Sequence, residues 1–260
     1  MNDLFRVPAY DLTGKVALVT GSTRGIGHAI AAGFASAGAS VAVVGRKSAD
    51  CARVQQEFEE RGYRCFGAAA DMGDTDSIER LVGAVENQYG HIDILVNNAG
   101  IGGKEAPILD ISTDEWDQTQ NVDLKGIFFC AKAVAAGIKA RGTGGRIINM
   151  ASAAGILAPK YVSVYGAAKA AVIHLTKIMA NEWARYNINV NAIAPGYIAT
   201  DMTKGVMADE KNASAVLKKI GLRRFGEVDD VVGAALFLAT EASRYITGAL
   251  LPVDGGMTIN

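Results

Sequence analysis

The stretch Lys15-Val-Ala-Leu-Val-Thr-Gly-Ser-Thr-Arg-Gly-Ile-Gly27 joins an apolar strand to a helix through a turn rich in glycine. The run 15–20 has the composition of a buried strand, and Ile26, Ile30 and Phe34 then recur at helical spacing. Such a turn exposes backbone N–H groups at the positive end of the helix dipole, which suits a pyrophosphate group. The residues that we expect to contact a dinucleotide here are Gly21, Thr23, Arg24, Gly25, Ile26 and Gly27.

The same alternation of strand and helix continues through the chain. Further apolar runs begin at positions 40, 64, 93, 146, 189 and 249, and stripes of helical spacing lie between them. Seven such strands alternating with six helices predict an α/β, Rossmann-type fold, a doubly wound and seven-stranded parallel sheet flanked by helices. No linker composition divides the 260 residues, so we expect a single domain over 1–260. The alternation lapses after Thr200, and we expect a substrate lid around 197–225.

Composition indicates small-molecule partners. The chain has 26 basic and 27 acidic residues, and its net charge of -1 gives no reason to expect nucleic acid or a membrane as a partner. Its three cysteines, Cys51, Cys65 and Cys130, have no metal-like spacing, so we expect no metal site and a reducing compartment. The segment 1–8 contains acid and proline where a signal peptide would be basic and then apolar. These features predict a cytoplasmic protein.

The end of the second strand bears on the choice of cofactor. A carboxylate at this position binds the adenosine ribose hydroxyls and disfavours a 2′-phosphate, but the chain reads Gly45-Arg46-Lys47. The missing acid and the cations Arg46, Lys47 and Arg24 favour NADP(H), with NAD(H) as the second choice. The alternative is that Arg46 and Lys47 are solvated loop charges.

Proton chemistry is predicted for the stretch from Ile147 to Lys169. Tyr165 and Lys169, in Tyr-Gly-Ala-Ala-Lys, share one face if they lie on a helix. A free tyrosine titrates near ~10, and an adjacent cation favours the phenolate, so such a pair can exchange protons near neutral pH. Ser152, at the end of the preceding apolar strand, can join them in holding a carbonyl oxygen. The alternative is that the pair is a chance spacing and that Ser152 only caps a turn.

Over nearly its whole length, from Leu12 to Met257, the chain resembles the short-chain dehydrogenases/reductases. The resemblance rests on Thr20-Gly21-x-x-x-Gly25-x-Gly27, Asn97-Asn-Ala-Gly100, Ser152, Tyr165-x-x-x-Lys169 and Pro195-Gly196, in this order. It implies an NADP(H)-dependent oxidoreductase that interconverts an alcohol and a ketone. In this scheme Tyr165 is the acid/base, Lys169 favours the phenolate and binds the nicotinamide ribose, and Ser152 holds the substrate oxygen.

The resemblance also implies further cofactor contacts and an assembly. The remaining cofactor-binding residues that it implies are Asp71, Met72, Asn98, Ala99, Gly100, Pro195, Gly196, Ile198 and Thr200. From its position alone, Asp71 can equally begin the next turn. A homotetramer is expected, because the helices around Phe128 and Met179 carry apolar residues beyond one stripe.

One position departs from the family pattern. The family usually has asparagine in an Asn-Leu-x-Gly-x-Phe segment, whose helix supports a water leading to the lysine, whereas this chain has Asp123-Leu-Lys-Gly-Ile-Phe128. Aspartate keeps an acceptor and its backbone carbonyl can still hold the water. We therefore expect activity and keep Asp123 as a candidate catalytic residue, without assigning it the usual side-chain role. Asn121 would face elsewhere on the long helix that we expect from about position 112 towards 140.

The substrate class is predicted from resemblance alone. The segments 1–5, 195–203 and 253–257 look most like those of gluconate 5-dehydrogenases and related polyol or sugar dehydrogenases, with 3-oxoacyl-carrier-protein reductases as the alternative. Lys104 is either a contact for an anionic substrate or a solvated cation. A third hypothesis is a non-catalytic NADP(H)-binding protein, against which the intact set of Ser152, Tyr165 and Lys169 argues.

Overall fold

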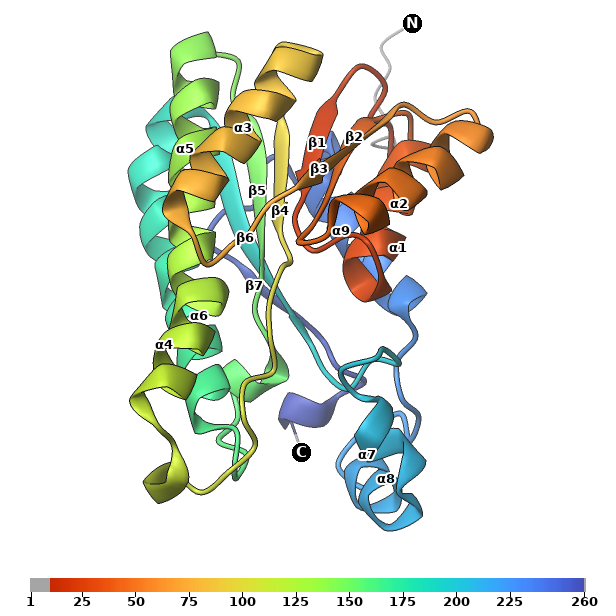
Figure 1. The fold of residues 1–260 in the computed structure, drawn as a ribbon, viewed down its shortest axis with the longest axis vertical. Coiled ribbons are helices and arrows are strands. Elements are labelled where there is room, and N and C mark those ends of the chain that lie inside the picture. The colour runs from red at the N-terminus through yellow and green to blue at the C-terminus, as the bar shows by residue number, and fades with distance from the viewer. Residues whose placement is uncertain (1–9, 260) are drawn as a thin grey trace, which may run out of the picture.

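The computed structural model describes residues 10–259 of the chain. The opening segment, on which the expected lack of an export signal and part of the substrate resemblance rest, lies outside these residues. Figure 1 shows the described chain as a twisted central sheet between two layers of helices. Within residues 10–259, no helix is both long enough and apolar enough to cross a membrane.

The sheet has seven parallel strands in the order β3-β2-β1-β4-β5-β6-β7. The strands are β1 (Val16–Val19), β2 (Ser40–Gly45), β3 (Cys65–Ala69), β4 (Ile94–Asn97), β5 (Gly145–Met150), β6 (Ile188–Pro195) and β7 (Leu250–Val253). This arrangement confirms the predicted doubly wound fold. The direction of winding reverses between β1 and β4, and ligands bind at the carboxyl ends of the strands at such a point.

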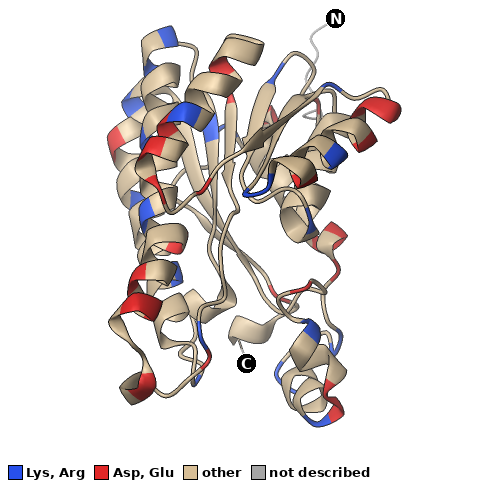
Figure 2. Ribbon diagram, viewed as in Figure 1, with Lys and Arg blue, Asp and Glu red and all other residues tan. Residues whose placement is uncertain are grey.

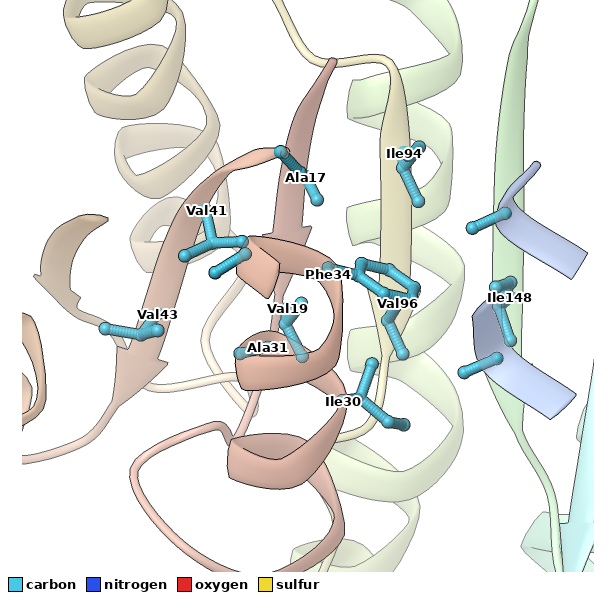
Figure 3. Close-up of a cluster of buried hydrophobic side chains, with 14 of the residues drawn as sticks. Ala17, Val19, Ile30, Ala31, Phe34, Val41, Val43, Ile94, Val96 and Ile148 are labelled. Carbon is cyan, nitrogen blue, oxygen red and sulfur yellow. The ribbon is translucent and has the colours of Figure 1, made fainter. Parts of the chain in front are cut away.

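Helices cover both faces of the sheet (Figure 1). One face carries α1 (Gly25–Ser36), α2 (Ser48–Glu60) and α9 (Val228–Ala239), and the other carries α3 (Thr75–Tyr89), α4 (Thr113–Gln120), α5 (Gly126–Arg141) and α6 (Ser163–Trp183). Along β1 the side chains alternate, because Ala17 and Val19 join the cluster beneath α1 while Leu18 joins the cluster beneath α3 and α5. Figure 3 shows the first cluster, in which Ile30 and Phe34 of α1 are fully buried. Burial on both faces explains why the strands read as continuous apolar runs.

Charged residues are almost confined to the helices and loops. Arg146 of β5 is the only charged residue within the seven strands of the described chain. Figure 2 shows the remaining charges on the helices and loops, including the segment of α7 (Lys204–Ala208) and α8 (Glu210–Leu217). This segment projects beyond the carboxyl ends of the strands, where the alternation of the sequence lapses (Figure 1).

The long helix expected from about 112 towards 140 is interrupted. α4 begins with a capping box of Ser112 and Glu115, and a single π-helical turn, Asn121–Lys125, separates it from α5. At the end of this turn a β-carbon on Gly126 would lie 2.1 Å from the carbonyl oxygen of Met72. Only glycine therefore lets the start of α5 approach the chain after β3 so closely. The wider turn directs Asp123 inward, and its side chain is fully buried.

Candidate active site

The glycine-rich turn packs tightly against the end of β4. Gly21 has a positive φ of 64°, and a β-carbon on it would lie 2.7 Å from the Cα atom of Ala99. A β-carbon on Gly27 would lie 2.4 Å from the side-chain Nδ2 atom of Asn98 and 2.5 Å from the carbonyl oxygen of Gly21. The turn can approach β4 in this way only because both positions lack a side chain.

Thr20 and Asn98 fasten this turn to β4. The Thr20 hydroxyl accepts the backbone N–H groups of Asn98 and Ala99, each at 3.0 Å. In return, the Asn98 side-chain amide donates to the carbonyl oxygens of Thr20 at 2.9 Å and Gly21 at 3.0 Å. The sequence predicts Asn98 as a cofactor contact; what the structure shows is that its side-chain amide holds the turn in shape.

The amino end of α1 has the features of an anion site. Arg24 precedes the helix without a side-chain hydrogen bond to it, and the first turn contains no acidic residue. By contrast, α3 and α4 begin with Asp74 and Ser112, whose side chains accept first-turn N–H groups. The first-turn N–H groups of α1 are therefore available to an anion at the positive end of the helix dipole. This turn fits the diphosphate of a dinucleotide.

A cavity of about 1050 Å³ lies at the carboxyl ends of the strands, beside this turn. The predicted residues that line it are Gly21, Thr23, Arg24, Gly25, Ile26, Gly27, Arg46, Asp71, Met72, Asn98, Ala99, Gly100, Ser152, Tyr165, Lys169, Pro195, Gly196, Ile198 and Thr200. Two predicted residues, Lys47 and Asp123, are not part of the lining. Lys47 is exposed and precedes α2, whereas Asp123 lies behind the cavity wall.

Residues that sequence reasoning missed also line the cavity. His28 follows the glycine-rich turn on α1, and Asp201 and Lys204 follow Thr200. Asp201 forms an ion pair of 3.0 Å with Arg24, and both side chains are exposed. His28, Asp201 and Lys204 each follow a predicted cofactor contact closely in the sequence, and this position is the signal that could have identified them as cavity residues.

Asp71 begins a turn and also lines the cavity. Its Oδ1 atom accepts the N–H of Gly73 at 2.8 Å, and its own N–H donates to the Ser77 hydroxyl at 3.0 Å. It therefore begins the turn before α3, which was the alternative interpretation of its position. It also lines the cavity, shortly after the end of β3.

The serine, tyrosine and lysine of the predicted set reach one cavity from two elements. Tyr165 and Lys169 lie on α6, with the Lys169 Nζ atom 5.5 Å from the centre of the Tyr165 ring. Lys169 is 3% exposed and donates to the carbonyl oxygen of Met150 at 3.1 Å. Ser152 follows β5, and its hydroxyl accepts the N–H of Ala154 at 3.1 Å. It thus caps a short turn, and it lines the same cavity.

Asp123 forms a buried ion pair with Lys169. Its Oδ2 atom lies 3.4 Å from Lys169 Nζ, and its Oδ1 atom accepts the N–H of Ile101 at 2.7 Å. Burial raises the pKa of the Asp123 carboxyl above its ordinary value, and the opposing attraction of Lys169 and the Ile101 N–H is smaller. A β-carbon on Gly100 would lie 3.2 Å from Asp123 Oδ2 and 3.4 Å from Lys169 Nζ, so the Asn-Asn-Ala-Gly segment closes over the pair. Asn121 faces away, towards a groove between α5 and α6.

Two further cations have partners that the sequence did not indicate. Arg53 of α2 donates to the carbonyl oxygen of Thr23 at 3.3 Å, which adds a positive charge behind the glycine-rich turn. Nothing in the spacing of Arg53 distinguishes it from the other arginines of the chain. Lys104 pairs with Glu115 at 2.9 Å and does not line the cavity.

Comparison with known proteins places the chain in a family. A family model described as enoyl-(acyl carrier protein) reductase matches residues 21–258, and relatives cover nearly the whole chain. The chain therefore belongs to this family of short-chain dehydrogenases/reductases, which are oxidoreductases. The resemblance found in the sequence is confirmed.

Within the family, two enzymes and one solved structure are particularly similar to the chain. Gluconate 5-dehydrogenase from Gluconobacter oxydans (strain 621H) is 40% identical over 251 residues, which are 96% of this chain and 97% of the relative. A 3-oxoacyl-(acyl-carrier-protein) reductase from Synechocystis sp. is 40% identical over 250 residues, 95% of this chain and 98% of the relative. The crystal structure of a gluconate 5-dehydrogenase from Burkholderia cenocepacia J2315 in complex with NADP and tartrate has a TM-score of 0.93 and 39% identity, and the match covers 96% of this chain and 98% of that chain.

Proposed function

We propose that the protein is an NADP(H)-dependent dehydrogenase that interconverts a secondary alcohol and a ketone on a sugar acid, polyol or ketose. The observation that carries this proposal is the meeting of Ser152, Tyr165 and Lys169 on the wall of the cavity that the glycine-rich turn also lines. A binding protein has no need of a phenol and an ammonium at such a place. The non-catalytic alternative therefore lacks an observation in its favour.

The proposed roles follow from the positions of the side chains. The nicotinamide, when bound, supplies a hydride to the carbonyl carbon. Ser152 holds the carbonyl oxygen by a hydrogen bond, and the Tyr165 hydroxyl donates a proton to it. Lys169, held by Met150 and Asp123, places a positive charge 5.5 Å from the Tyr165 ring centre and so stabilises the phenolate that remains. Asp123 acts on the reaction only through Lys169, so we propose it as a positioning residue.

The cofactor would lie along the cavity lining. The uncapped start of α1 would hold the diphosphate, and Arg46 would meet a 2′-phosphate at the end of β2. Gly45 offers no carboxylate to the ribose hydroxyls that NAD(H) presents there. A relative crystallised in complex with NADP supports the same choice. We therefore propose NADP(H) as the preferred cofactor and NAD(H) as the poorer one.

The substrate proposal rests on relatives and on one cation. A gluconate 5-dehydrogenase is 40% identical to the chain, and Lys204 of α7 lines the cavity, where it could meet a sugar acid carboxylate. The segment 197–225, with α7 and α8, would act as the lid. The reductase from Synechocystis sp. at equal identity supports the alternative, a 3-oxoacyl-(acyl-carrier-protein) reductase.

A panel of ketones with each cofactor tests the function. We expect oxidation of NADPH to be fastest with 5-ketogluconate, compared with ketoses, diketones and acetoacetyl thioesters. The kcat/KM for NADPH should exceed that for NADH by at least about tenfold, since an arginine–phosphate contact near the surface contributes on this scale. Faster turnover of the acetoacetyl thioester would favour the alternative enzyme. NADPH binding without turnover of any ketone would favour the non-catalytic protein.

We further propose a cytoplasmic homotetramer, with a dimer as the next choice. A groove of about 550 Å³ runs between α5 and α6 and is lined by apolar residues that include Leu124, Phe128 and Ile178. Phe128 is 40% and Ile178 44% exposed, whereas Met179, on which the expectation partly rested, points inward and is buried. Exposed aromatic and aliphatic side chains along two long helices are typical of subunit contacts. Light scattering at micromolar concentration should report a mass well above the 27.2 kDa of one chain, and a mass near 27 kDa would reject both assemblies.

A further inference from the structure

The end of β2 is closed by the glycine-rich turn. A β-carbon on Gly45 would lie 2.7 Å from the Cγ2 methyl carbon of Thr23 and 3.1 Å from its hydroxyl oxygen. On its other side it would lie 3.4 Å from the Sγ atom of Cys51, which is buried and donates to the carbonyl oxygen of Ala68 at 3.2 Å. The space beside Gly45 is thus already filled by two side chains from different elements.

Thr23 cannot leave this space easily. Its side chain is short and branched at the β-carbon, so χ1 rotation can move one branch away only by moving the other. Its carbonyl oxygen also accepts a hydrogen bond from the Arg53 guanidinium at 3.3 Å, which is a further contact of this turn. A contact of 2.7 Å between carbon atoms is far inside van der Waals distance, so a side chain at position 45 would have to displace this turn.

The consequence concerns the cofactor. A site that prefers NAD(H) needs a carboxylate at the end of the second strand, where it accepts the ribose hydroxyls. Here the β-carbon of that residue would overlap the Thr23 methyl group before its carboxylate could reach the ribose.

We propose that Thr23 is a specificity-determining residue, which excludes an acidic side chain from position 45 and so keeps the ribose site selective for NADP(H). This inference rests on the proposed use of NADP(H), and it attributes the cofactor selectivity to two features of the ribose site. Arg46 provides the positive charge for a 2′-phosphate, and the contact between Thr23 and Gly45 withholds the acceptor that NAD(H) requires.

Four variants of the full-length protein test this proposal: Gly45→Asp, Thr23→Ala, the double variant Thr23→Ala/Gly45→Asp, and Thr23→Val/Gly45→Asp. Valine is the matched control, because it keeps both branches of threonine, whereas alanine removes them. For each variant we would measure the Kd of NADH and NADPH by fluorescence titration and the Tm of the cofactor-free protein. All variants keep Arg46, so the informative quantity is the gain in NADH affinity.

We expect Gly45→Asp to lower Tm by about 5 °C, because overpacking of a tight site is destabilising. It should gain no NADH affinity, and Thr23→Val/Gly45→Asp should behave in the same way. The double variant with alanine should bind NADH at least about tenfold more tightly than the wild type, and its Tm should recover to within about 2 °C of Thr23→Ala.

The proposal would be overturned if the single variant Gly45→Asp had the same Kd for NADH as the double variant Thr23→Ala/Gly45→Asp. Additive Tm changes would overturn it too, since the two positions would then not be in contact. Recovery of Tm without tighter NADH binding would also reject it, because the contact would then affect packing alone. Failure of the proposed function is distinguishable, because a wild type that bound NADPH no more tightly than NADH would refute the NADP(H) preference itself. The comparison of Tm among the variants would still test the contact between Thr23 and Gly45.

Discussion

Replacing Tyr165 by phenylalanine should lower kcat by about 10² or more, because a phenyl ring of the same shape cannot deliver a proton to the substrate oxygen. Tyr165 lies on the cavity wall close to the Lys169 ammonium, so removing its hydroxyl changes the proton source and little of the packing. The Kd of NADPH, measured by fluorescence titration, should stay within about twofold of the wild-type value, which corresponds to less than 0.5 kcal/mol.

Tyr161→Phe provides a matched control for this experiment. Tyr161 lies shortly before α6, is 56% exposed and does not line the cavity, so the same loss of a hydroxyl there should leave kcat unchanged. If Tyr165→Phe kept a tenth of the wild-type kcat, Tyr165 would not be the acid/base.

Replacing Asp123 by alanine should lower the free energy of unfolding by about 3–5 kcal/mol, the range observed when one partner of a buried ion pair is removed. Lys169, 3% exposed, would then lie in the interior without a counter-ion, and the N–H of Ile101 would lose its acceptor. Asp123→Asn keeps an acceptor and should cost less. Urea unfolding at a fixed protein concentration measures both variants.

A substitution of Lys169, the partner of Asp123, provides the control for this prediction. If the pair is real, Asp123→Ala/Lys169→Met should be less destabilised than the sum of the single variants; additivity would reject the coupling.

The raised pKa of the Asp123 carboxyl gives the sign of the pH dependence of stability. A raised pKa means that the native state holds this proton more tightly than the unfolded state does. The resulting stabilisation is present below the unfolded value of 3.8 and is lost as pH rises through the native value. The stability of the wild type relative to Asp123→Asn should therefore decrease as pH rises above about 4.

The fold was predictable because its signals are local. The strands are buried on both faces, so each reads as a short apolar run, and the glycines of the first turn mark where the chain must change direction. Most of the residues that line the cavity were predictable for a related reason: in a parallel sheet they follow the carboxyl ends of strands, so their order along the chain already places them together. Tyr165 and Lys169 instead reach the cavity from α6.

The contacts that the sequence did not reveal depend on packing between distant elements. The burial of Asp123 against Lys169 depends on the π-helical turn, which forms where the start of α5 meets the carbonyl oxygen of Met72, and no spacing of apolar residues indicates it. The packing of Thr23 against Gly45 likewise depends on how closely the glycine-rich turn approaches the end of β2. Lys104 shows the same limit, since its pairing with Glu115 depends on how the chain after β4 folds back onto α4.

The strand order has a consequence for how the chain is made. All six neighbouring pairs of strands are parallel, so none forms as a simple hairpin, and each must await a crossover helix. β2 and β3 can assemble beside β1 soon after they leave the ribosome. The other edge of β1 must wait for β4, where Asp93 accepts the N–H of Val16 from 77 positions further along the chain. Folding dominated by such distant pairing is slow. Until β4 emerges, the centre of the finished sheet is an open edge of the nascent one, able to pair with another chain.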